Sequence, residues 1–432
     1  MQAGSARVEI TPPKGGPMGG YIERAEPAED VHDPLYARAL VLEDGQRRVA
    51  LLSADIHEVP PAFAAEVRYR IERELGIPDD HTLFAVSHTH AGPLVAGRRV
   101  GVPDALYVDT LRDRLVGAVR AACGALRPAR IGAGSGKLYL GANRRARHAG
   151  GKAPGRYASP YARIFVAAEE GGGPIALLFT YGAHPNVLGP ENRLISGDYA
   201  GQAERTVEEN FGGTATALFA LGFAGDVEAN HSKRDFEEVE TFGAALGRAV
   251  LEAMKAIPLE SGLALRARSL RVALPLAPMP TLEAAERRLM AERDRLSALL
   301  GRGASKAEMA QQRAVADRAQ QVLQAASQGR AVPRAELEVQ AIAIGRIALL
   351  GVSAEPFAEH EKALGELSPF EHTLPISCAN GCIGYIPTAE AFAEGGYEIE
   401  SAPCLHGLLP FVPEAATVFR QAMARVLVDL AE

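Results

Sequence analysis

Residues 36–54, YARALVLEDGQRRVALLSA, are the stretch of the sequence that decides the fold. Two apolar runs, 36–42 and 48–54, flank a turn that contains Asp44-Gly45, and this pattern predicts a β-hairpin. Residues 61–75 then carry apolar side chains at helical spacing, and a third strand is expected at 83–86. A β-β-α-β beginning predicts an α/β protein with a mixed β-sheet core flanked by helices.

The rest of the chain continues this alternation. RIFVAAEEGGGPIALLFTYGAH (163–184) predicts a second hairpin that turns at the triple glycine, and TALFALGFAGD (216–226) predicts a buried strand. Residues 281–328 are rich in Ala, Glu, Gln and Arg, and Ser305 and Glu308 form a capping box, so we expect a helical hairpin insertion that packs or acts as a lid. No domain boundary is evident, and residues 1–432 are expected to form a single domain.

Composition and charge exclude several classes of protein. A chain of 432 residues that is 47% hydrophobic and 23% charged has a globular composition, and a net charge of -7 gives no basic surface for nucleic acid. The N-terminus does not resemble a signal peptide, and no apolar run approaches the roughly 18 residues of a membrane helix. We therefore expect a cytoplasmic protein without an integral membrane segment. The sequence leaves the oligomeric state open, a homo-oligomer included.

The four cysteines are too few for a disulfide framework. Cys378 and Cys382 are separated by three residues, but no second pair completes a zinc-finger spacing, and Cys123 and Cys404 lie elsewhere in the chain. We interpret all four as reduced thiols of the core, with a local disulfide near Cys404 as the alternative.

Ionisable side chains follow several predicted strands directly. His88 follows TLFAV, His184 follows IALLFTYGA, Asp226 follows ALFALGFAG, and Glu355 follows RIALLGVSA. Ligands bind at the carboxyl ends of strands in open α/β sheets, and two histidines with a carboxylate are a usual ligand set for catalytic zinc. The pair His88-Thr89-His90 alone leaves three alternatives open: a metal site, acid–base chemistry or a structural turn.

Six blocks of the sequence occur in the order found in one known family. They are SHTHAGP (87–93), YGAHPNVLG (181–189), ISGDYAGQAE (195–204), GFAGDVEAN (222–230), GVSAEPF (351–357) and NGCIGYIPTAEAFAEGGYE (380–398). Together with the opening VEITPP (8–13), they resemble the catalytic domain of the neutral/alkaline ceramidases. The resemblance implies a zinc-dependent hydrolase in which a metal-activated water cleaves an amide bond. It implies one zinc per chain, held by His88, His184, Glu355 and Tyr385.

The resemblance also implies roles for residues around the metal. If the segment after the strand stays extended, His90 faces the same side as His88, and we assign it to acid–base work. Arg144, in ANRR, is expected to donate to the substrate carbonyl, although the match could shift to Arg145. Tyr397, in GGYE, is expected to contribute a hydroxyl group.

The departures from the family pattern concern the substrate. Glu228 stands where these ceramidases carry a serine, and a carboxylate there would favour a cationic or hydroxylated substrate. The sequence stops at residue 432, and we expect it to lack their C-terminal β-rich domain. It has no tryptophan and is only 6% aromatic, which is unfavourable to a long acyl groove. We therefore predict a zinc amidohydrolase for a small or soluble N-acyl substrate. The alternatives are a true ceramidase or other lipid amidase, a zinc esterase or lactonase, and a non-catalytic binding protein.

Overall fold

The computed structural model describes residues 1–95, 101–148, 156–330 and 334–432. Its main element is an eight-stranded mixed sheet in the order β11-β9-β8-β6-β1-β3-β4-β5. The strands are β1 (Gln2–Glu9), β3 (Tyr36–Glu43), β4 (Arg48–Ala54), β5 (Thr82–Val86), β6 (Arg127–Lys137), β8 (Tyr161–Glu169), β9 (Pro174–Tyr181) and β11 (Thr216–Leu221). The β11–β9 and β4–β5 pairs are parallel, and the other neighbours are antiparallel, so the predicted mixed sheet is confirmed.

The two predicted hairpins are present. Strands β3 and β4 pair antiparallel, and in their turn Asp44 Oδ1 accepts the backbone N–H groups of Gln46 and Arg47 while Gly45 takes a φ of +90°. Strands β8 and β9 form the second hairpin. Strand β1, which the sequence patterns did not predict, lies between β6 and β3 in the middle of the sheet.

Helices cover one face of this sheet. They are α1 (Pro61–Leu75), α2 (Ala105–Gly124), α4 (Asp198–Asn210) and α5 (Phe236–Met254). Their apolar faces share one buried cluster with inward-facing residues of the sheet such as Phe84 and Phe179. Burial of such side chains is the main source of stability for a layered fold.

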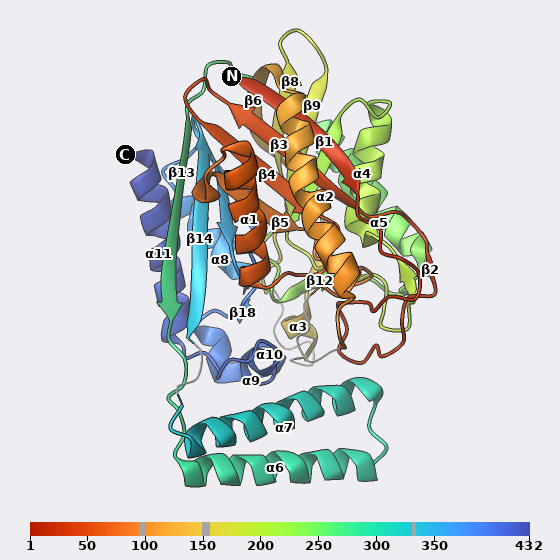
Figure 1. Cartoon of the computed structure of the whole chain (residues 1–432), viewed down its shortest axis with the longest axis vertical. Coiled ribbons are helices and arrows are strands. Elements are labelled where there is room, and N and C mark those ends of the chain that lie inside the picture. The colour runs from red at the N-terminus through yellow and green to blue at the C-terminus, as the bar shows by residue number, and fades with distance from the viewer. Residues whose placement is uncertain (96–100, 149–155, 331–333) are drawn as a thin grey trace.

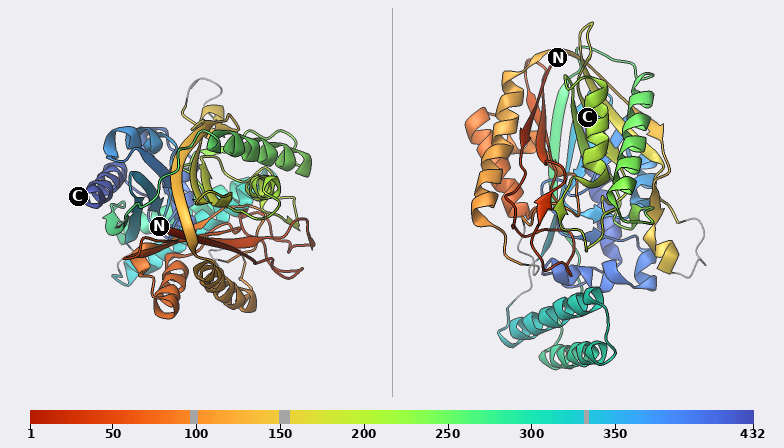
Figure 2. Two further views of the ribbon diagram at one scale, coloured as in Figure 1. Left: turned by 90° about the horizontal axis from the view of Figure 1, so that it is seen from above. Right: turned by 90° about the vertical axis from the view of Figure 1, so that its right-hand side faces the viewer.

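A second sheet packs on the opposite face. It has the order β13-β14-β15-β17, formed by β13 (Leu265–Leu274), β14 (Ala335–Ile344), β15 (Ile347–Val352) and β17 (His372–Ile376). Phe165 and Leu178 of the large sheet share a buried cluster with Ile342 and Leu349 of the small one. The outer face of the small sheet is covered by α8 (Glu359–Leu367) and α11 (Glu414–Ala431). The protein therefore has four layers, helix, sheet, sheet and helix, which Figure 2 shows from above.

The remaining elements gather at one end of the sheets. Three short strand pairs join the loops at this end. They are β2 (Asp30–Val31) with β10 (Leu194–Ile195), β7 (Gly141–Asn143) with β12 (Val227–Ala229), and β16 (Glu355–Pro356) with β18 (Tyr385–Ile386). Short helical turns accompany them: α3 (Arg144–His148), η2 (Glu390–Glu394), α9 (Tyr397–Glu400) and α10 (Ala402–Leu405). The turn η1 (Asp79–His81) instead precedes β5, at the other end of that strand.

The predicted helical hairpin is formed by α6 (Leu282–Gly301) and α7 (Lys306–Ser327), which lie beyond α9 and α10 in Figure 1. The Ser305–Glu308 capping box begins α7. Arg318 Nε of α7 donates to the carbonyl of Leu408 at 3.2 Å, which anchors the hairpin to the main body. That residues 1–432 form a single catalytic domain stays a prediction. Among the described residues, every helix is too short or too polar to cross a bilayer.

Candidate metal centre and active-site cavity

Three of the four predicted metal ligands converge at the ends of strands. His88 follows β5, His184 follows β9, and Glu355 begins β16; all three side chains are buried. Their ligand atoms lie within 4.8 Å of one another. Glu355 Oε2 is 3.1 Å from His184 Nε2 and 3.5 Å from His88 Nε2. Segments far apart in the sequence therefore build one His-His-Glu group.

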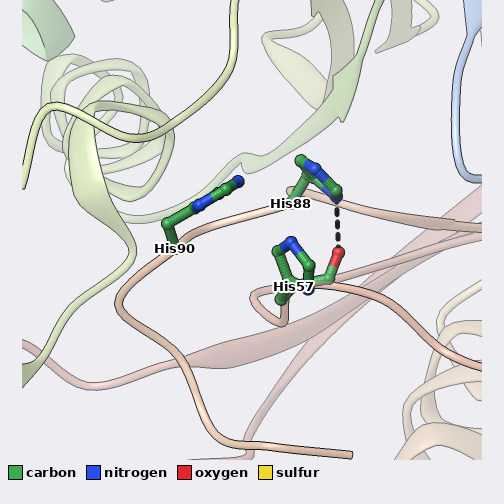
Figure 3. Close-up of side chains that lie close together, drawn as sticks. All are labelled: His57, His88 and His90. Atoms are coloured by element: carbon green, nitrogen blue, oxygen red, sulfur yellow. Dashed lines mark hydrogen bonds between the residues drawn. The ribbon is translucent and has the colours of Figure 1, made fainter. Parts of the chain in front are cut away.

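Backbone carbonyls orient both imidazoles of this group. The Nδ1 atom of His88 lies 2.7 Å from the carbonyl oxygen of His57, as Figure 3 shows, and His184 Nδ1 lies 2.9 Å from that of Val227. A carbonyl can only accept, so each Nδ1 carries a proton, and each Nε2, which faces Glu355, is the nitrogen available to a metal. This arrangement of the partner nitrogen is typical of metal-bound histidines. The donor set therefore fits a zinc ion.

Electrostatics within the group favour a charged carboxylate. Burial alone would raise the pKa of Glu355, but His88 and His184 outweigh it and hold that pKa well below its usual range. Burial alone would lower the pKa of His88, and the neighbouring Glu355 reverses this and raises it. For His184, burial has the largest effect on the pKa and lowers it.

The extended segment expected between His88 and His90 is wrong. His88 has a φ of +65°, so the chain turns sharply there after β5 ends at Val86. The two rings still lie close together, 5.2 Å apart and nearly perpendicular (Figure 3). The backbone N–H of His90 donates to the carbonyl of Pro185 at 3.0 Å, which holds the ring beside His184. A tertiary contact, and not strand alternation, thus places His90.

His90 borders a cavity of about 110 Å³ that the metal group also reaches. The described residues that line it include Glu355, Tyr385 and Tyr397. Neither ring nitrogen of His90 has a hydrogen-bond partner among the described residues, although both are shielded from solvent. Burial and the three neighbouring histidines lower the pKa of His90 well below its usual value. His90 is therefore a neutral imidazole whose ring nitrogens are available for proton transfer.

The predicted ligand Tyr385 lies next to Glu355. The two residues are register partners in the parallel β16–β18 pair. The Tyr385 ring centroid is 6.5 Å from that of His184 and 5.9 Å from that of Tyr397. Tyr397, which is 36% exposed, stands at the outer side of the cavity. The structure thus brings both tyrosines to the His-His-Glu group.

Arg144 and Arg145 diverge from one turn of helix α3. The guanidinium carbon of Arg144 lies 5.4 Å from the centre of the Tyr385 ring, and its Nη2 donates to the Gly225 carbonyl at 2.7 Å. Arg145 instead donates to Glu394 at 3.0 Å and to the Gly395 carbonyl at 2.8 Å. Arg144 is therefore the arginine on the side of the metal group.

Glu228 and Asp226 lie near the metal group but are not among the described residues that line the cavity. Glu228 lies between buried Val227 and Ala229 in β12, bridged to His184 through the backbone. Asp226 accepts from Asn143 Nδ2 at 2.6 Å and from the backbone N–H of Ala358 at 2.8 Å, so it joins loops.

Sequence reasoning missed several residues of this region. His57, which lines the cavity and stacks on His88 at 4.3 Å, follows strand β4 and could have been found by the strand-end criterion. Glu398 accepts hydrogen bonds from Arg144 Nε at 2.8 Å and from Arg145 Nη1 at 2.7 Å. No local sequence pattern indicates this role. No disulfide joins any of the four cysteines, all of which lie among the described residues, so the alternative of a local disulfide near Cys404 is not seen.

The fold and this group of side chains define a four-layered α/β protein with a buried His-His-Glu constellation. The chain belongs to the neutral/alkaline non-lysosomal ceramidase family, whose N-terminal domain model matches residues 1–242. The resemblance seen in the sequence is thereby confirmed.

Individual relatives align with part of the chain. A neutral ceramidase of Mycobacterium tuberculosis is 25% identical over 241 residues, 49% of this chain and 38% of that protein. Neutral ceramidase A of Dictyostelium discoideum is 25% identical over 261 residues, 53% of this chain and 36% of that protein. The matched region thus spans less than half the length of these relatives.

Solved structures show the same fold over the whole chain. The crystal structure of neutral ceramidase from Pseudomonas aeruginosa has a TM-score of 0.74 at 20% identity, covering 99% of this chain and 74% of that one. A structure described as ceramidase complexed with C2 has a TM-score of 0.74 at 17% identity, covering 100% and 75%. The second sheet and the C-terminal helices, which lie beyond the family match, are therefore part of the shared fold.

Proposed function

We propose that this protein is a zinc-dependent hydrolase that cleaves the amide bond of an N-acyl substrate. The observation that carries the proposal is the convergence of His88, His184 and Glu355 within 4.8 Å, with the Nδ1 proton of each histidine held by a backbone carbonyl. Membership of the ceramidase family supports the reaction class. Tyr385, the register partner of Glu355, is the fourth proposed ligand.

Zinc bound to this group would act as a Lewis acid and lower the pKa of a coordinated water towards neutrality. The residues around it have complementary tasks. His90 accepts a proton from the attacking water on an available ring nitrogen and transfers it to the departing amine. Arg144 and Tyr397 donate hydrogen bonds to the substrate carbonyl, where negative charge develops in the transition state. Glu398 holds the Arg144 guanidinium in position through its Nε.

The cavity favours a small substrate. Its volume of about 110 Å³ is below the roughly 300–1,000 Å³ of pockets for drug-sized ligands, although Tyr397 also lines a second cavity of about 670 Å³ together with Arg144. We therefore propose a small or soluble N-acyl compound and keep ceramide as the second candidate, because the matched relatives are named neutral ceramidases. An ester or lactone is the third candidate, because the same metal group would attack either acyl type.

The test combines metal removal with a substrate panel. The purified protein is assayed on N-acetyl and N-hexanoyl amines, their matched esters and a short-chain ceramide, before and after treatment with a strong chelator. We expect amide hydrolysis that disappears with chelation and returns on addition of Zn²⁺. Activity that survives complete metal removal would refute the zinc mechanism, and turnover of esters alone would refute the amidase assignment.

A matched pair of variants links the activity to the proposed ligands. His184→Ala removes one member of the group and should lose both zinc and turnover. His32→Ala removes a histidine that stacks on Phe236, 3.7 Å away, and should leave both unchanged. If His184→Ala kept full zinc and turnover, the ligand assignment would be wrong.

A further inference from the structure

A second group of potential metal ligands lies beside the first. Glu58 follows β4, Cys382 precedes β18, and His406 follows α10; their ligand atoms lie within 4.8 Å of one another. Glu58 and His406 line the same cavity as His90 and Glu355. Three separate segments thus bring a carboxylate, a thiol and an imidazole to the wall of the cavity.

Glu355 contacts both groups, with one oxygen directed to each. Its Oε2 is the atom near His184 and His88, at 3.1 and 3.5 Å, while its Oε1 lies 3.8 Å from Cys382 Sγ. A carboxylate that offers one oxygen to each of two donor groups has the geometry of a bridging ligand. Two-metal hydrolytic sites place their ions roughly 3.5–4 Å apart.

The backbone at Gly384 allows the His406 imidazole to approach Cys382 closely. Gly384 has a φ of +99°, and a Cβ atom there would lie 2.8 Å from Cδ2 of His406, so only glycine admits this imidazole. The Gly384 backbone N–H also donates to Cys382 Sγ at 3.4 Å, which fixes the position of the sulfur. Cys382 itself is fully buried.

Charge and donor type indicate what this group would hold. The acidic side chains of Glu58 and Glu355 lie beside the sulfur of Cys382 in one small space, which favours a cation over an anion. Thiolate and imidazole donors select zinc or a similar transition metal over Mg²⁺ and Ca²⁺, which prefer oxygen ligands. We infer that Glu58, Cys382 and His406, joined by Oε1 of Glu355, bind a second zinc-type ion next to the first.

Metal titration of the full chain tests this inference directly. The protein is freed of metal with a chelator and titrated with Zn²⁺ and, separately, with Co²⁺. We expect two equivalents to bind, and the cobalt form to show the near-ultraviolet absorption of a thiolate bound to Co²⁺. Cys382→Ser should bind one equivalent and lose this absorption, and His406→Ala should also bind one.

The controls separate ligation from the general effects of mutation. Cys123→Ser removes a thiol of helix α2 remote from the cavity and should keep both equivalents and the absorption. Far-ultraviolet circular dichroism establishes that each variant is folded. Saturation of the wild-type protein at one equivalent, or a cobalt spectrum without the thiolate band, would overturn the second site whatever the variants do.

This inference does not depend on the proposed reaction. One bound equivalent with chelator-sensitive amide hydrolysis would remove the second site and leave the proposed function standing. Two equivalents without hydrolysis of any substrate in the panel would support the second site and contradict the function.

Discussion

Glu355 and Tyr385 face each other in register across a parallel pair of two-residue strands, β16 and β18. The backbone N–H of Glu355 donates to the carbonyl of Gly384 at 2.9 Å, and that of Phe357 to the carbonyl of Ile386 at 3.0 Å. These bonds hold the carboxylate and the phenol ring at the same wall of the cavity. They bring two residues from separate loops close enough to serve the proposed metal ion together.

The first prediction concerns Glu355. Glu355→Gln keeps the size of the side chain but removes the charge that pairs with His88 and His184, so zinc affinity should fall by more than the roughly 10- to 100-fold typical of outer-sphere changes. Zinc retention is measured by competition with a chromophoric chelator. Glu359→Gln, which changes an exposed carboxylate on helix α8, is the control and should bind zinc like wild type. Equal affinities for both variants would exclude Glu355 as a ligand.

The second prediction distinguishes His88 from His90. His88→Ala should lose most of the metal, because its Nε2 faces Glu355. His90→Ala should keep the metal and lose kcat by roughly 100- to 10,000-fold, the range for removal of an acid–base group. Metal content and kcat are measured on the same preparations. A His90→Ala protein that is empty of metal beside a fully loaded His88→Ala protein would reverse the two roles.

The third prediction concerns Glu398, which pairs with Arg144 and Arg145. Its side chain is 4% exposed, and Glu398→Gln would remove the charged partner of the largely buried Arg144 and leave the neighbouring Arg145 with only the partly exposed Glu394. Breaking a buried ion pair costs about 3–5 kcal/mol of unfolding free energy. Urea denaturation measures the loss.

The matched control for Glu398 uses the same arginine. Glu394 also pairs with Arg145, but its side chain is 40% exposed, so Glu394→Gln should cost below about 1 kcal/mol. If both substitutions had the same small effect, the Glu398 pairs would not be important for stability.

The fourth prediction concerns pH and Asp198. Its carboxylate accepts backbone N–H groups of Leu188 at 3.0 Å and Tyr199 at 2.7 Å, and so supports the loop that follows His184. Burial raises the pKa of Asp198 to about 6. The folded state therefore holds this proton more tightly than the unfolded state. The resulting stability is complete below about pH 4 and is lost as the pH rises through 6.

Asp198→Asn makes this dependence measurable, because asparagine cannot titrate and tolerates the φ of +53° at this position. The difference in unfolding free energy between wild type and Asp198→Asn should grow in favour of wild type as the pH falls from 6 to 4. The slope should be up to about 1.4 kcal/mol per pH unit. Loss of the proposed zinc in acid would affect both proteins alike and cancel in the difference. A difference that stays constant over this range would contradict the raised pKa.

The local sequence determined the β3–β4 hairpin, helix α1 and the positions of His88 and His184 after their strands. Each depends on signals within a few residues: the Asp44-Gly45 turn, helical spacing, and apolar runs that end at a polar side chain. The family blocks similarly indicated Glu355 and Tyr385, because motifs persist along the chain even where overall identity is low.

Tertiary structure alone decided how these residues meet. Long-range contacts join segments distant in the sequence: His90 with Pro185, Glu355 with Tyr385, and Glu398 with two arginines. The same holds for Glu58, Cys382 and His406. The left-handed turn at His88 was also not evident from the local pattern. Local periodicity records which face of an element is buried but not which element covers it. Long-range packing therefore determines the site's geometry, whereas the sequence by itself determines the elements and the donor types.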